Sequence, residues 1–148
     1  MSSSRSFSSV SPGDVLPELA IPITRTLIVA GALASRDYQD VHHDAKLAVE
    51  RGSPDIFMNI LTSNGLVGRY VTDWTGPEGF LRKVDIRLGA PNYPDDTMTM
   101  SGEVVSVSDD EADPTRGVVT VAVAGANSIG SHVVGTVIVT LPKDEEKR

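Results

Sequence analysis

The second half of the chain alternates apolar and polar residues in short stretches rich in β-branched side chains. Turn-forming sequences that contain Pro, Gly, Asn and Asp separate these stretches. The pattern predicts four consecutive strands, at residues 81–89, 97–107, 117–125 and 133–141. Because the connections between them are short, we expect antiparallel pairing.

In the first half of the chain, the spacing of apolar residues mostly predicts helices instead. A strand is expected at 18–24, a short helix at 25–35 and one or two helical turns at 46–51. The stretch 56–74 repeats apolar residues at spacings of three and four, which predicts one long helix with Asp55 as its N-cap. The charged stretch between the two short helices is expected to form a loop.

These elements together predict the fold. An antiparallel sheet of at least five strands must bury one face, and only the helix at 56–74 is large and apolar enough to cover it. A sheet wrapped around one long central helix is the hot-dog fold, an α+β arrangement. The Ser-rich residues 1–12 are expected to be a disordered tail, and residues 13–148 a single domain.

Composition excludes several kinds of chemistry. The chain of 148 residues contains no cysteine, so disulfides and thiolate sites are excluded. Its net charge of −7 and its scattered basic residues argue against nucleic acid as a partner. The apolar runs are too short for a membrane helix, and we expect a cytoplasmic protein. Chemistry must therefore come from histidines, carboxylates, hydroxyls or backbone amides.

The loop 36–44 gathers most of the residues that could carry acid/base chemistry. His42 and His43 stand there beside three aspartates, whereas His132 is expected at the surface. An alternative is that the aspartates only cap turns and the histidines are exposed and inert. Two adjacent histidines on a loop are weak evidence for a metal, so no metal site is expected.

The same loop resembles a known motif. Residues 34–42, ASRDYQDVH, resemble the motif A-x-S-G-D-x-N-P-x-H of the MaoC-like, (R)-specific enoyl-CoA hydratases. Asp37 and His42 match its Asp and His, five residues apart, and the order of predicted elements matches over residues 17–142. Within this family, the chain is similar to the small MaoC subunit of actinobacterial steroid side-chain hydratases.

The chain also departs from the family pattern. Arg36, Gln39 and Asp40 stand where the motif has Gly, Asn and Pro. The His-Gly pair that usually opens the central helix is replaced by Met58 and Asn59. A backbone N–H that binds the thioester oxygen does not depend on the side chain, so this function can survive the replacement.

The resemblance implies a catalytic site. Asp37 and His42 would hold one water, which adds to C3 of a trans-2-enoyl-CoA while the same pair returns a proton to C2. A backbone N–H near Asn59 would stabilise the enolate-like oxygen. The residues expected to contact the substrate are Met58, Asn59, Ile60, Asn64 and Arg82.

Several of these contacts have plain structural alternatives. Asn59 and Asn64 could instead cap buried backbone groups. Arg82, with Lys83 and Arg87, is the best basic group for the CoA nucleotide, although these residues could equally form a solvated strand face.

Partners follow from the same resemblance. Hot-dog proteins pair their sheets, so a second copy or a paralogous MaoC-like chain is expected, as a dimer or heterotetramer. The resemblance implies a paralogous partner that carries a DUF35 domain, and this domain would in turn bind a thiolase-like aldolase. It also implies a cholesterol-type steroid acyl-CoA as the substrate and no cofactor. The alternatives are an acyl-CoA thioesterase and a non-catalytic binding half of a hydratase.

Overall fold

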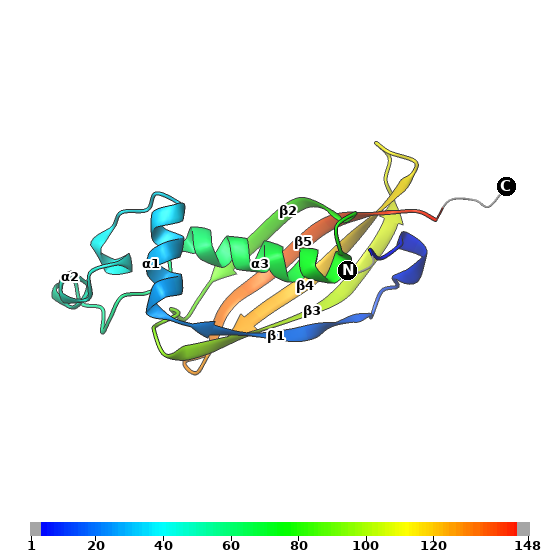
Figure 1. Ribbon diagram of the computed structural model, residues 1–148. Helices are drawn as coiled ribbons and strands as arrows, with labels where there is room; N and C mark the ends of the chain where they lie inside the picture. Colours follow the sequence, from blue (N-terminus) through cyan, green and yellow to red (C-terminus); the bar gives the residue numbers. More distant parts are fainter. Residues whose placement is uncertain (1–3, 145–148) are drawn as a thin grey trace.

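One curved antiparallel sheet forms the body of the protein in the computed structural model, which describes residues 4–144 (Figure 1). The strand order is β1-β3-β4-β5-β2, and every neighbouring pair is antiparallel. The strands are β1 (Val15–Ile23), β2 (Phe80–Leu88), β3 (Asp96–Asp109), β4 (Arg116–Ala126) and β5 (Ser131–Pro142). All five predicted strands are confirmed.

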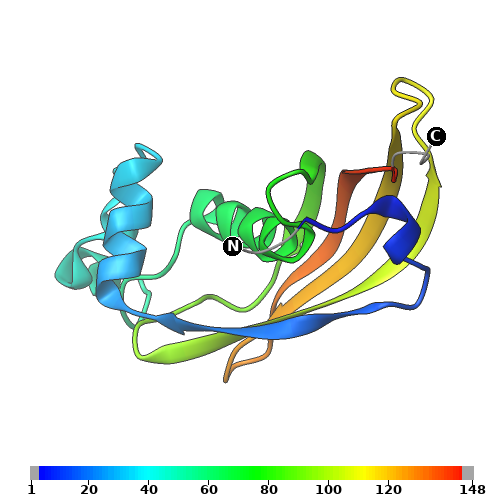
Figure 2. The ribbon, with the colours of Figure 1, turned by 45° about the vertical axis from the view of Figure 1, so that its right-hand side comes forward.

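The helices are α1 (Arg25–Ala34), α2 (Ala45–Glu50) and α3 (Ile60–Thr75). The sheet curves around α3, while α1 and α2 lie together at one end of it (Figures 1 and 2). Buried residues of α3, among them Leu66, Val67 and Val71, pack on the sheet. The hot-dog architecture predicted from the sequence is confirmed.

The sheet buries one face because its strands alternate. In β4 every second residue from Gly117 to Gly125 is buried, and the residues between them are only partly covered. The buried valines of β4 join those of β5 and the methionines Met98 and Met100 of β3 in one core. Burial of this apolar surface is the main stabilising term.

The long helix begins later than predicted. Asn59, rather than Asp55, is its N-cap, and the Asn59 side chain accepts a hydrogen bond from the Thr62 N–H at 3.0 Å. Asp55 instead forms an ion pair with Arg25, which lies on α1. Both Asn and Asp are good caps, so residue type alone did not separate the two positions.

The predicted disordered tail is wrong for residues 4–12, and residues 1–3 lie outside the described part of the chain. Phe7–Ser9 form a 3-10 helix, and Val10 is buried. The Arg5 guanidinium lies over the Trp74 ring, and its Nε donates to the Trp74 carbonyl at 3.0 Å. Phe7 and Val10 supply the apolar anchors that a Ser-rich composition concealed.

Within residues 4–144, none of the helices is both long enough and apolar enough to cross a membrane. The predicted domain end at residue 148 lies beyond the described residues, because the description stops at Asp144.

Candidate active site

The turn after α1 directs Asp37 toward the start of α3. Ser35 ends the helix, and Arg36 adopts a left-handed backbone conformation with φ of 56°. The Asp37 N–H then donates to the Ala32 carbonyl at 2.9 Å and closes the turn. Glycine reaches this left-handed conformation at lower cost than arginine. Arg36 therefore keeps the backbone shape expected of the motif glycine.

Asp37 and His42 face each other across the loop. Asp37 Oδ2 lies 3.4 Å from His42 Nε2. The other ring nitrogen of His42, Nδ1, lies 2.7 Å from the Phe57 carbonyl, which can only accept, so Nδ1 carries the hydrogen. When the ring is neutral, Nε2 therefore has no hydrogen and faces the Asp37 carboxylate. One water molecule can join these two acceptors by donating both of its O–H groups.

His42 is held firmly in this position. It ends the short 3-10 helix Asp40–His42, and only 6% of its surface is exposed. Its ring is nearly perpendicular to the Phe57 ring, with 4.9 Å between the ring centroids, and the Phe57 N–H donates to the Val41 carbonyl. The segment before α3 therefore orients the imidazole from two sides.

Asn59 links the loop to the central helix. Its Nδ2 donates to Asp37 Oδ2 at 3.1 Å and to Ser35 Oγ at 2.9 Å. Its Oδ1 accepts from the N–H and the Oγ1 hydroxyl of Thr62. The sequence left open whether Asn59 contacts a ligand or caps the backbone, and in the structure it is a cap.

The other residues expected at the start of α3 have different environments. Met58 is buried, and its N–H donates to the Asn92 carbonyl at 3.0 Å. Ile60 is 54% exposed. Asn59 Oδ1 accepts from the Thr62 N–H, and the N–H groups of Ile60 and Leu61 in the same turn have no hydrogen-bond partner among residues 4–144.

Asn64 and Arg82 do not join Asp37 and His42. Asn64 lies on α3 after the first turn, with its Oδ1 buried and unpaired among the described residues. Arg82 Nη2 is paired with Asp110 Oδ2 at 2.5 Å, and its guanidinium also lies over Phe80. Arg82 is near the start of β2, the end of that strand away from the site.

The remaining charged residues of the loop have structural partners. Asp40 forms an ion pair with Arg51, whose hydrogen bond lowers the pKa of that carboxyl. Asp44 caps α2, and His43 Nε2 lies 3.1 Å from the Tyr38 carbonyl. No group of three or more metal-binding side chains is found in the described part of the chain. The loop thus contributes one acid/base pair rather than a cluster.

His132 is buried, not at the surface as the sequence suggested. Its Nδ1 donates to the Ala90 carbonyl at 2.6 Å, and its Nε2 accepts from the Ser63 hydroxyl at 2.8 Å. Ser63 lies one helical turn after Asn59, so the histidine fastens the first turn of α3 to the loop after β2. No local pattern could reveal this pairing, because 69 positions separate the two residues.

We expect His132 to make the folded state sensitive to mild acid. Burial lowers the pKa of His132 from its ordinary value of 6.5, against a smaller opposite effect of the Ala90 carbonyl. The unfolded chain therefore takes up a proton near pH 6.5 that the folded chain resists, so stability falls as pH drops below this value. Urea unfolding at pH 7.5 and 5.5 measures the loss.

The control for this prediction is His132→Asn, which keeps a donor and an acceptor but does not titrate. The variant should lose less free energy of unfolding between the two pH values than the natural chain does. The two proteins differ only at position 132, so the contributions of all other groups cancel in the comparison. Equal losses in the two proteins would contradict the assignment.

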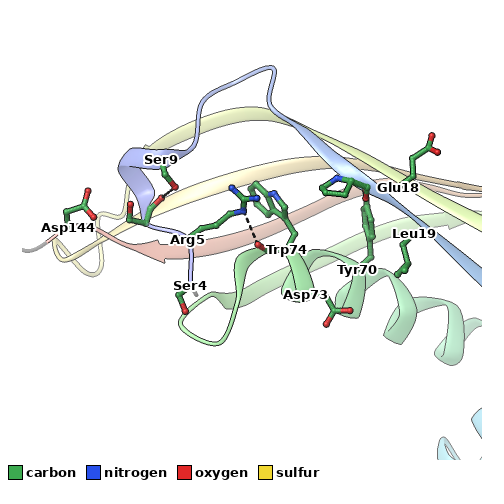
Figure 3. Close-up of a pocket in the computed structure, with 11 residues that line it drawn as sticks. Ser4, Arg5, Ser9, Glu18, Leu19, Tyr70, Asp73, Trp74 and Asp144 are labelled. Carbon is green, nitrogen blue, oxygen red and sulfur yellow. Dashed lines mark hydrogen bonds between the residues drawn. The ribbon is translucent and has the colours of Figure 1, made fainter. Parts of the chain in front are cut away.

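Two of the hollows beside α3 differ in their distance from the acid/base pair. The larger, of about 780 Å³, is lined by Tyr70, Trp74 and residues of the N-terminal segment (Figure 3). It adjoins the last turns of α3, whereas Asp37 meets the first, and α3 is about 24 Å long. The smaller hollow, of about 350 Å³, lies between α1 and α3 and includes Ser35, next to Asn59. Only the smaller one adjoins the acid/base pair.

Comparisons with known proteins found similar chains. The chain is 54% identical over 125 residues to the 3-oxo-4,17-pregnadiene-20-carboxyl-CoA hydratase beta subunit of Mycobacterium tuberculosis (strain ATCC 25618 / H37Rv), which covers 84% of this chain and 92% of that protein. The crystal structure of the ChsH1–ChsH2 complex from Mycobacterium tuberculosis contains a chain that is 51% identical, with a TM-score of 0.82, over 88% of this chain and 98% of that one. The chain belongs to the MaoC-like hydratase family.

The same fold occurs in solved structures of much lower sequence identity. R-hydratase PhaJ1 from Pseudomonas aeruginosa superposes with a TM-score of 0.80 at 20% identity, over 94% of this chain and 86% of that one, which shows a shared fold. A scan against protein-family models gave no match. Membership in the MaoC-like family thus rests on the curated relative.

Proposed function

We propose that this chain is the subunit that carries the acid/base pair of a heteromeric enoyl-CoA hydratase. The observation that carries the proposal is the pair of acceptors, Asp37 Oδ2 and His42 Nε2, that converge at 3.4 Å. A thioester hydrolase needs only one carboxylate and a differently aimed water. Two convergent acceptors on one loop suit a water that must be oriented as well as deprotonated.

The reaction follows from this geometry. The water oxygen bonds to C3 of a trans-2-enoyl thioester while Asp37 accepts one of its protons. The C2–C3 π electrons move toward the thioester carbonyl, which becomes enolate-like. The Asp37 and His42 pair then returns a proton to C2, so the substrate gains one water and the site regains its starting state.

The start of α3 is suited to stabilise the enolate-like oxygen. The uncapped N–H groups of Ile60 and Leu61 lie directly after Asn59, which contacts Asp37. A helix N-terminus carries partial positive charge, and fixed N–H donors stabilise developing negative charge. The exposed Ile60 side chain beside them is available to a bound acyl group.

The hollow between α1 and α3 is the proposed place for part of the acyl group. Its lining includes Gly31, Ala34, Leu61 and Gly65, which are small or apolar. A bulky apolar substrate fits such a surface better than a polar one. The name of the Mycobacterium tuberculosis relative, a hydratase of a pregnadiene-carboxyl-CoA, supports a steroid acyl thioester as the substrate class.

The free edge of β2 is the proposed place for a partner. β1, the other edge of the sheet, contains Pro17 and Pro22, which cannot donate to a further strand. β2 contains no proline, and its Phe80 and Leu88 side chains are exposed. The relative is a beta subunit and the similar structure is a two-protein complex, which supports a paralogous MaoC-like chain. We further propose that this partner chain carries a DUF35 domain, which binds an aldolase.

The decisive experiment is a hydration assay with and without the co-expressed paralogous chain. Crotonyl-CoA and a steroid enoyl-CoA are compared by the loss of the enoyl thioester absorbance. We expect turnover of the steroid thioester only by the complex. Turnover of crotonyl-CoA by this chain alone would indicate a general homodimeric hydratase. Free CoA release would indicate a thioesterase, and no reaction in any sample would leave a binding role.

A further inference from the structure

The Asn59 side chain does more than cap a helix. We propose that Asn59 is a positioning residue that holds the Asp37 carboxylate and the first turn of α3 in one rigid frame. The inference rests on the proposed hydratase function, because it assigns roles within that same site. Its basis is that four hydrogen bonds meet on a single carboxamide that is only 2% exposed.

The orientation of this carboxamide is unambiguous. The Thr62 backbone N–H can only donate, so the Asn59 atom 3.0 Å from it must be the oxygen, Oδ1. Nδ2 must then point the other way, toward Asp37 Oδ2 and Ser35 Oγ. The orientation that caps the helix therefore necessarily presents a donor to the carboxylate.

This donor has a consequence for the reaction. Asp37 Oδ2 receives Asn59 Nδ2 from one side and faces His42 Nε2 from the other. The carboxylate is thereby fixed in rotation, and the water it would share with His42 has one preferred place. The same carboxamide sets the helix turn whose Ile60 and Leu61 N–H groups would bind the enolate-like oxygen. The Asp37 carboxylate and the N–H groups of Ile60 and Leu61 are therefore held in fixed positions relative to each other.

A purely structural cap is the alternative, and it predicts different behaviour. Asp is as good an N-cap as Asn, so Asn59→Asp preserves the bond from the Thr62 N–H. It replaces the donor Nδ2 by a second carboxylate oxygen, about 3 Å from Asp37 Oδ2, and like charges at this distance repel. A mere cap would tolerate this substitution, whereas a positioning residue would not.

The test uses the co-expressed complex and the steroid enoyl-CoA. For Asn59→Asp we expect kcat to fall by roughly 10- to 100-fold with a much smaller change in KM, and the acid limb of the pH–rate profile to move to higher pH. The matched control is Thr24→Ala, which removes the N-cap of α1, where Thr24 accepts from the Leu27 N–H far from Asp37 in the chain. This control should keep kcat, while its melting temperature falls because the helix cap is lost.

A second readout does not depend on activity. At a fixed pH, the proton NMR signals of the His42 ring should shift in Asn59→Asp relative to the natural protein, because Asp37 Oδ2, which His42 Nε2 faces, loses the Asn59 donor. The ring signals of His43, whose Nε2 lies beside the Tyr38 carbonyl, should be unchanged. Normal kcat and unshifted His42 ring signals in Asn59→Asp would overturn the inference. Shifted His42 signals in a complex without hydratase activity would uphold it and contradict the proposed function instead.

Discussion

Replacing Asp37 by Asn is expected to lower kcat for hydration by about 10²- to 10⁴-fold, the range typical of a lost general acid/base group. The carboxamide keeps the shape of the carboxylate and can still accept from Asn59 Nδ2, so the fold should be unchanged. It cannot accept a proton from water at neutral pH, however. KM should change little, because the attacking water and not the substrate loses its partner.

The matched control for Asp37→Asn is Asp40→Asn in the same loop. Asp40 is paired with Arg51 and does not face His42, so its loss should cost little beyond a partly exposed ion pair. Steady-state kinetics of both variants in the complex, with thermal melting as a check of folding, separates the two roles. Equal activity of Asp37→Asn and the natural protein would remove Asp37 from the mechanism.

Replacing Gly135 by Ala is expected to destabilise the protein by about 3 kcal/mol and to release β2 from the sheet. A Cβ at this position of β5 would lie 2.1 Å from the Asp85 carbonyl oxygen and 2.7 Å from Ile86 Cα. Both are backbone atoms of β2, so relief requires the strand itself to move. Gly135 pairs with Ile86 in the β2–β5 register, and that register would be lost locally.

This substitution also bears on assembly. If the partner binds the free edge of β2, the Gly135→Ala variant should fail to retain the paralogous chain in size-exclusion chromatography at 25 °C, even where it remains folded. Urea unfolding gives the stability change. A variant of natural stability would show that the sheet can adjust, and retained complex with a disturbed β2 would place the partner elsewhere.

Gly65→Ala serves as the control for Gly135. A Cβ at Gly65, on the exposed side of α3, meets nothing within 4 Å. Alanine has the higher helix propensity, so this variant should be as stable as the natural protein or more stable by up to about 1 kcal/mol. Comparing the two variants separates the free-energy cost of a clash between β5 and β2 from the cost of adding a methyl group elsewhere.

The sequence by itself determined the order and type of the secondary structure. Alternating valines in β4 and β5 and the spacing of Val67 and Val71 in α3 are local patterns, set by which face of each element is buried. The stretch that resembles the family motif likewise lies within nine consecutive residues, and its Asp37 and His42 are five apart. Features that depend on residues so close along the chain can be predicted from the sequence.

Only the tertiary structure decided how the site is completed. The bond between Ser63 and His132 spans 69 positions, and the one between Asn59 and Asp37 spans 22. The Ser-rich N-terminal segment became ordered because Arg5 meets Trp74, 69 positions away. The residues next to each of these side chains in the sequence do not indicate its distant partner. The partners come together because the sheet curves around α3, and each polar group that is buried there must then form a hydrogen bond.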